Sequence, residues 1–332
     1  DASVEDTERA IAAARRAFDE SPWATDHALR SRCLRQLRDG LQERIEELRK
    51  ITVSEVGCPI SMTYGPGLDD CVKWLGDYAN FLDGYEWKTD MGVAEVMGSK
   101  TQRWILREPA GVMAAITPWN VPNDINLKKL GWAMAAGCTV VLKAAPTTSW
   151  CANFLGEIIA TKTDVPAGAV NILTSGDNAA IGEMLTADPR VDMVGFTGST
   201  GVGKRIGEVC GSQVKRVQLE LGGKSAAIVL PDMPGLTHVA GAMGGTVCFH
   251  AGQGCAIFTR LLVPKSELAA CADAVIETLN NVKYGDPFDP ENIMGPQNSA
   301  LQRERVEGHI QRAIDQGGKL LVGGGRATQF EK

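Results

Sequence analysis

Residues 111–116 read GVMAAI, an uninterrupted apolar run, and a helix-forming stretch follows at about 122–136. The same order recurs, because strand-like and helical runs alternate throughout 111–230. Further strand-like runs lie at 139–142, 169–173, 192–196 and 226–230, and further helical runs at about 149–161, 177–186 and 201–210. Such alternation is typical of a parallel, doubly wound sheet. Ligands of these sheets bind at the carboxyl ends of the strands.

Other elements are expected on both sides of this region. Apolar and polar residues around a Gly98-Ser99-Lys100 turn predict a β-hairpin at 91–109. Residues 231–332 predict the start of a second α/β domain. Periodicity predicts a first helix capped by Ser3, helices at about 26–55, 68–83, 266–282 and 299–316, and a strand at 259–263. The sequence therefore predicts an α/β fold with a doubly wound parallel sheet, a second α/β domain and a hairpin.

Composition limits the classes of function. The chain has 332 residues, of which 44% are hydrophobic and 22% charged, a size and balance that fit two globular domains. A net charge of −6 argues against nucleic-acid or anionic-membrane partners, and no apolar run is long enough to span a membrane. The nine cysteines include no Cys-x-x-Cys pair, which argues against a disulfide framework or a metal site and favours a reducing, cytoplasmic location.

Two glycine-rich segments carry candidate chemistry. Cys255 ends the segment GQGC at 252–255, where glycines expose the sulfur, so it is a candidate nucleophile. Glu220 begins ELGGK at 220–224 and is a candidate general base. The alternatives are a buried structural cysteine and a surface or ion-paired glutamate. Cys248 is the nearest rival nucleophile, but it lacks the glycine context.

Five blocks occur in a fixed order: TPWNVP at 117–122, VVLK at 140–143, FTGSTG at 196–201, ELGGK and GQGC. Together they resemble the NAD(P)-dependent aldehyde dehydrogenase superfamily of the non-acylating, hydrolytic type, from about residue 5 to the end. The resemblance implies a dinucleotide-binding domain at 1–90 and 110–221, an oligomerisation arm at 91–109 and a catalytic domain at 222–332. The family's later Glu-x-Phe-Gly-Pro block is absent, so we expect the chain to be C-terminally incomplete.

The resemblance also implies a reaction. Cys255 would attack an aldehyde to form a thiohemiacetal and then a thioester, and Asn120 would stabilise the oxyanion. Glu220 would activate water to release a carboxylic acid, and its glycine-rich, apolar setting predicts partial desolvation and a raised pKa. Because coenzyme A-acylating relatives usually lack this glutamate, we expect a free acid as product.

The implied cofactor is NAD or NADP. Lys143 would bind the adenosine ribose, and the turn at 198–203 would bind the pyrophosphate at a helix N-terminus. Many NAD-preferring members have a glutamate where this chain has Pro146, so only family frequency favours NAD. The residues expected to bind cofactor are Ile116, Thr117, Pro118, Trp119, Lys143, Gly198, Ser199, Gly203, Leu221 and Gly222.

The expected partners are a small-molecule aldehyde and further copies of the chain, as a dimer or tetramer at full length. Val121 replaces a commoner aromatic residue and would widen the substrate tunnel. Asn123, Asp124 and Lys128 follow on the next helix and either suit a polar aldehyde or are simply solvated.

The sequence also allows several functions other than aldehyde oxidation. The turn Gly198–Gly203 with Lys204 partly matches a nucleotide-triphosphatase loop, but Arg205 replaces the hydroxyl that magnesium needs. His250 near Cys255 allows a Cys–His hydrolase, although a structural histidine is commoner. A cofactor-independent thiol esterase and a catalytically incompetent fragment are the main alternatives to the dehydrogenase.

Overall fold

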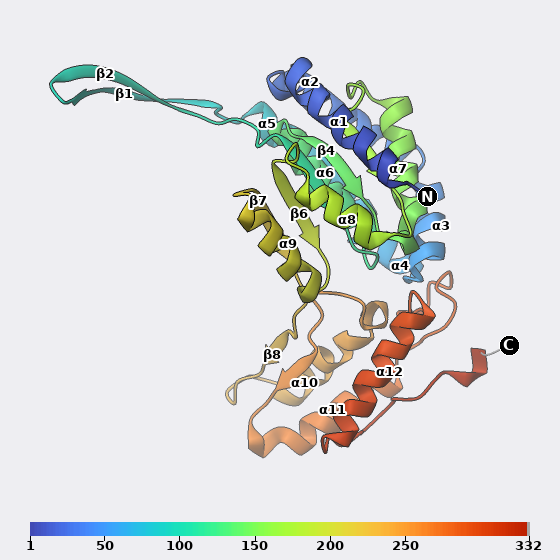
Figure 1. The fold of residues 1–332 in the computed structure, drawn as a ribbon. Helices are drawn as coiled ribbons and strands as arrows, with labels where there is room; N and C mark the ends of the chain where they lie inside the picture. Colours follow the sequence, from blue (N-terminus) through green and yellow to red (C-terminus); the bar gives the residue numbers. More distant parts are fainter. Residues whose placement is uncertain (331–332) are drawn as a thin grey trace. The chain divides into compact units, whose positions relative to one another are not determined.

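The computed structural model describes residues 1–330, and the chain divides into two compact units (Figure 1). The first unit comprises Asp1–Leu48 and Asp69–Leu221. The second comprises Arg49–Leu68 and the residues from Gly222 onward. Within the described residues, no helix combines the length and apolar character that a membrane span requires.

The first unit is built on a five-stranded parallel sheet, as the alternation of strands and helices predicted. The strand order is β5-β4-β3-β6-β7. The chain therefore runs from β3 outward to β5 and then returns to the other side of β3, which places the switch point between β3 and β6. The strands are β3 (Val112–Ile116), β4 (Thr139–Lys143), β5 (Val170–Leu173), β6 (Met193–Thr197) and β7 (Arg216–Glu220).

Helices cover both faces of this sheet (Figure 1). One face packs against α1 (Val4–Glu20), α8 (Asn178–Ala187) and α9 (Thr200–Ser212). The other face packs against α6 (Pro122–Ala136) and α7 (Ser149–Lys162). Both of these helices contact α2 (His27–Glu43), and α6 also contacts α5 (Asp69–Asp83). Alternate residues of β3 point to opposite faces, so Val112, Ala114 and Ile116 join the core beneath α1.

Two expectations about these elements were wrong. The run 226–230 does not belong to the parallel sheet, because β8 (Ala226–Ile228) pairs with β9 (Arg260–Leu262) in a separate sheet. The fifth strand is β7, whose polar and apolar residues alternate because most of this edge strand is exposed. The single helix expected at 26–55 is interrupted at Arg44, after which α3 (Ile45–Val56) begins.

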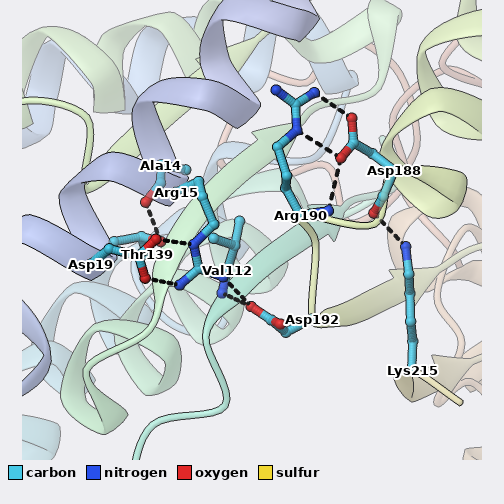
Figure 2. Close-up of polar contacts among 9 residues, drawn as sticks. All are labelled: Ala14, Arg15, Asp19, Val112, Thr139, Asp188, Arg190, Asp192 and Lys215. Carbon is cyan, nitrogen blue, oxygen red and sulfur yellow. Dashed lines mark hydrogen bonds and ion pairs between the residues drawn. The ribbon is translucent and has the colours of Figure 1, made fainter.

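Polar contacts at the amino-terminal ends of the strands join α1 to the sheet (Figure 2). Asp192 accepts hydrogen bonds from Val112 N at 2.7 Å and from Arg15 Nη1 at 2.9 Å. Thr139 Oγ1 donates to the carbonyl oxygen of Ala14 at 3.0 Å. Gly111 adopts φ +122°, and a Cβ there would lie 1.9 Å from Asp192 Oδ2. This end of the sheet is therefore closed by paired charges.

The predicted hairpin forms from β1 (Lys88–Val96) and β2 (Ser99–Leu106), which pair antiparallel and project from the first unit (Figure 1). Its turn places Met97 and Gly98 in the left-handed region, at φ 51° and 79°. Val93, Trp104 and Leu106 are exposed along it.

The second unit combines short helices with the β8–β9 pair. Its helices are α4 (Ile60–Thr63), α10 (Leu236–Gly245), α11 (Leu268–Asn280) and α12 (Ala300–Asp315), and the short 3₁₀ helices of the chain are η1 (Pro22–Ala24), η2 (Pro146–Thr148), η3 (Thr246–Gly252), η4 (Lys265–Glu267) and η5 (Thr328–Phe330). The predicted boundaries placed all of 1–90 with the cofactor domain, whereas Arg49–Leu68 groups with this unit. The reason is hydrogen bonding: Asn298 Nδ2 donates to Glu55 O at 2.9 Å, and Ile60 N donates to Pro287 O at 2.8 Å.

Candidate active site

Four strands of the first unit end at one edge of the sheet. In the register, Ile116 is opposite Lys143 and Phe196, and Thr197 is opposite Glu220. Backbone hydrogen bonds continue past the strand ends, from Thr117 N to Lys143 O at 3.1 Å and from Gly198 N to Glu220 O at 3.0 Å. The structure thus brings Thr117, Lys143, Gly198 and Glu220 together at the carboxyl edge. Of the other residues expected to bind cofactor, Ile116 is buried, Pro118, Trp119 and Leu221 are half-buried, and Gly222 is exposed in the second unit.

The glycine-rich turn after β6 opens helix α9. Ser199 is the N-cap residue, and its Oγ accepts from Val202 N at 3.5 Å. A Cβ on Gly198 would lie 2.5 Å from Phe196 Cζ, and one on Gly203 would lie 2.3 Å from Leu221 Cδ2. Glycine therefore lets the turn pack closely while the first amides of a 13-residue helix face outward, an arrangement that favours a phosphate group.

Arg205, which weakened the triphosphatase interpretation, lies in α9 beyond the turn. Its guanidinium forms ion pairs with Glu183 and Glu208 on the outer surface. It therefore contributes to helix packing and brings no hydroxyl to a metal ion.

Lys143 ends β4 and is only 3% exposed. Its Nζ donates to Ala144 O at 3.0 Å and to Asn178 Oδ1. Burial lowers the pKa of Lys143 to about 8. An ammonium group at the carboxyl edge of the sheet fits a ribose or phosphate of a dinucleotide. Pro146 is exposed three residues later, in η2, and brings no carboxylate to this place.

Asn120 follows β3 and is half-buried. It does not cap the next helix, because the N-cap residue of α6 is Val121 and the helix begins at Pro122. Asn120 lies near the N-terminus of α6, where the helix dipole favours an oxyanion.

A charged pair lies on α6 after Asn120. Asp124 and Lys128 follow at four-residue spacing, so they share its side of the helix. Lys128 Nζ lies 3.0 Å from Asp124 Oδ1 and 4.6 Å from the Trp74 ring centroid. The Asp124 side chain is only 13% exposed, and burial raises its pKa against the opposing effect of Lys128. Asp124 is thus a packed, paired group rather than a solvated one, while Asn123 is buried.

Glu220 ends β7, and its side chain is exposed in the described structure. The expected partial desolvation is not seen, since the edge strand leaves this face uncovered. A residue that the motifs did not reveal lies nearby: Lys129 of α6, which is buried against β6. Burial lowers the pKa of Lys129 to about 8, and the negative charge of Glu220 opposes this effect. The sequence gives no clear signal for this burial, because Lys128 and Lys129 both lie between Leu127 and Leu130 and only Lys129 is buried.

Cys255 lies in the second unit, after the short helix η3. All nine cysteines lie in the described part of the chain, and Cys255 alone among them is exposed. Cys248 is half-buried, and burial raises its pKa, which suppresses the thiolate. Ser225 Oγ donates to Cys255 O at 3.5 Å, while His250 at the start of the loop is buried. Exposure therefore separates Cys255 from its rival.

The whole chain, residues 1–332, matches the model of the aldehyde dehydrogenase family. It is 35% identical over 327 residues to a putative aldehyde dehydrogenase, DhaS, of Bacillus subtilis strain 168, covering 98% of this chain and 64% of that protein. It is also 35% identical to an aminoacetaldehyde dehydrogenase of Pseudomonas aeruginosa, with coverage of 98% and 64%.

Solved structures of aldehyde dehydrogenases are also similar to this chain. The NAD-dependent aldehyde dehydrogenase of Sinorhizobium meliloti has a TM-score of 0.90 at 37% identity, covering 98% of this chain and 64% of that one. The Mycobacterium tuberculosis aldehyde dehydrogenase complexed with NAD+ has a TM-score of 0.91 at 36% identity, with coverage of 98% and 66%. This chain thus spans slightly less than two thirds of these relatives, and over that length it belongs to the aldehyde dehydrogenase family.

Proposed function

We propose that this chain provides the cofactor-binding and thiol-bearing parts of an enzyme that oxidises an aldehyde to a carboxylic acid with NAD+ or NADP+. The observation that carries the proposal is the exposure of Cys255 in its glycine-rich loop, while the other cysteines are buried or half-buried. Membership of the family supports the reaction class.

The cofactor would be held by the carboxyl edge of the first unit. The Lys143 ammonium and the amides that open α9 after Gly198 and Ser199 supply the polar contacts, and Gly203 keeps the turn compact. When bound, NAD(P)+ accepts the hydride that leaves the aldehyde carbon. The names of two similar solved structures include NAD, which supports NAD as the cofactor. Pro146 places no negative charge against a 2′-phosphate, so NADP fits the residues as well.

The chain's own residues would carry the remaining steps. The Cys255 thiolate forms a C–S bond to the carbonyl carbon, and the Asn120 amide donates to the resulting oxyanion. Loss of hydride leaves a thioester on the sulfur. Glu220 then accepts a proton from water, which attacks the thioester carbon, and the C–S bond breaks to release the carboxylate and regenerate the thiolate.

The roles of the larger parts follow from the same proposal. The sheet with its helices acts as the dinucleotide-binding domain and the second unit as the catalytic domain. The β1–β2 arm, with Val93 and Trp104 exposed, pairs the chain with further copies of itself as a homo-oligomer. All nine cysteines are free, which fits residence in a reducing compartment.

The test is formation of NAD(P)H, followed by absorbance, with a panel of aldehydes and each cofactor. Cys255→Ala should abolish reduction, because no other exposed thiol is present, and Cys248→Ala is the matched control that should keep it. Equal activity in Cys255→Ala and the parent would end the proposal. Ester hydrolysis without cofactor reduction would favour a thiol esterase. Cofactor binding by calorimetry without any turnover would identify an incompetent fragment.

A further inference from the structure

The loop that presents Cys255 begins with a strained turn. His250, Ala251 and Gly252 have φ of 51°, 53° and 75°, so three consecutive residues occupy the left-handed region. Two of them carry a Cβ and pay a steric cost in this conformation. Such a turn persists only when its surroundings hold it in place.

A second segment of the same unit supplies that support. Gln297 Nε2 donates to the carbonyl oxygen of Ala251 at 2.9 Å. The buried Gln253 side chain accepts from Asn298 N at 2.9 Å and donates to Pro296 O at 3.3 Å. Gln253 Nε2 also donates back to His250 O at 3.2 Å. Three of these bonds join residues 251 and 253 to segment 296–298. The fourth, from Gln253 Nε2 to His250 O, lies within residues 250–253.

Segment 296–298 is itself anchored. Asn298 Nδ2 donates to Glu55 O at 2.9 Å, and a Cβ on Gly57 would lie 2.9 Å from Pro296 Cγ. A Cβ on Gly295 would lie 2.1 Å from Gly57 O. The support for the turn therefore rests on a close-packed backbone.

We propose that Gln253 and Gln297 are positioning residues that clamp the left-handed turn His250–Gly252 and so hold Cys255 in its exposed place. The inference rests on the proposed role of Cys255 as nucleophile. Neither glutamine is proposed to act on the substrate directly, because both act through the backbone two to five residues before the thiol. Without the clamp, the turn relaxes to unstrained φ values and withdraws the sulfur from its reactive position.

The first variant is Gln297→Glu, which keeps the side-chain shape but cannot donate to Ala251 O. We expect the rate of iodoacetamide alkylation at Cys255, read by peptide mass spectrometry without cofactor, to fall about tenfold, the size expected of one well-formed hydrogen bond. The turnover number should fall with it, while the dissociation constant for NAD+ stays the same. Gln311→Ala, which removes an exposed glutamine whose side chain donates to Asp315, is the matched control and should behave as the parent.

A rescue experiment separates positioning from general stability. Glycine adopts the left-handed region without steric cost, so Ala251→Gly added to Gln297→Glu should restore most of the alkylation rate. Ala251→Gly alone should keep the parent rate, because the clamp is intact. A lowered melting temperature with an unchanged alkylation rate in Gln297→Glu would overturn the proposal, and so would failure of the rescue. Turnover that survives in Cys255→Ala would instead overturn the proposed function itself.

Discussion

The two edges of the parallel sheet differ in the environment of their charged side chains. At the amino-terminal edge, charged groups are paired: Arg190 Nε donates to Asp188 Oδ1 at 2.9 Å, and Arg15 Nη1 donates to Asp192 Oδ2 at 2.9 Å (Figure 2). At the carboxyl edge, Lys143 is buried against neutral oxygens, and burial lowers its pKa. The paired charges of the first edge stabilise the fold, and the second edge is where we propose that the cofactor binds, because ligands of parallel α/β sheets bind at the carboxyl ends of the strands.

The largest expected loss of stability at the amino-terminal edge comes from the substitution Gly111→Ala. The added Cβ meets Asp192 Oδ2 at 1.9 Å and forces φ +122° on a residue with a side chain. Both effects displace Asp192 from Val112 N, so we expect the free energy of unfolding to fall by about 4 kcal/mol. Chemical denaturation measures this change. Gly201→Ala, where a Cβ meets open space, is the matched control and should leave stability within about 0.5 kcal/mol of the parent.

The second prediction tests the chemistry of the carboxyl edge through Glu220→Gln. The amide cannot accept the proton of the attacking water, so steady turnover should fall about 100-fold. Acylation of Cys255 does not need this base, so a burst of NAD(P)H should remain in rapid mixing. Steady turnover at the parent rate would remove Glu220 from the proposed mechanism.

The third prediction compares a buried cation with a paired one. Burial lowers the pKa of Lys129 in the folded chain to about 8, below its ordinary value of 10.5, so the unfolded chain binds more protons between these values. Stability therefore rises as pH increases from about 8 to 10.5, and the full penalty applies at pH 7. Lys129→Met should remove the penalty and raise the free energy of unfolding at pH 7 by about 2 kcal/mol.

Arg190→Met is the counterpart at the other edge. It breaks ion pairs with Glu8 and Asp188, and it should lower stability by about 1 kcal/mol or less because the pairs are partly exposed. Denaturation curves of both variants across pH 7 to 10.5 test the comparison. A Lys129→Met variant that keeps the parent's pH dependence would contradict it.

Much of the first unit could be predicted from sequence because its core strands are continuous apolar runs between helices. Strands β3, β4 and β6 and helix α6 lie within a residue or two of the predicted ranges. Strand β7 was missed because an exposed edge strand carries polar residues such as Arg216 and Gln218 and lacks an apolar run. The separate pairing of β8 with β9 depends on residues more than thirty positions apart, which periodicity does not relate.

The sequence by itself determined the family and the candidate residues, because Asn120, Glu220 and Cys255 sit in short motifs whose order along the chain is informative. Only the tertiary structure decided which thiol is exposed, that Glu220 is exposed, and that Lys129 is buried near it. Only folding brings Gln297 to Ala251, 46 residues away, so the clamp on the strained turn has no sequence signature. The reason is physical: motifs record local chemistry, whereas burial, electrostatic environment and strain depend on what the rest of the chain packs against each group.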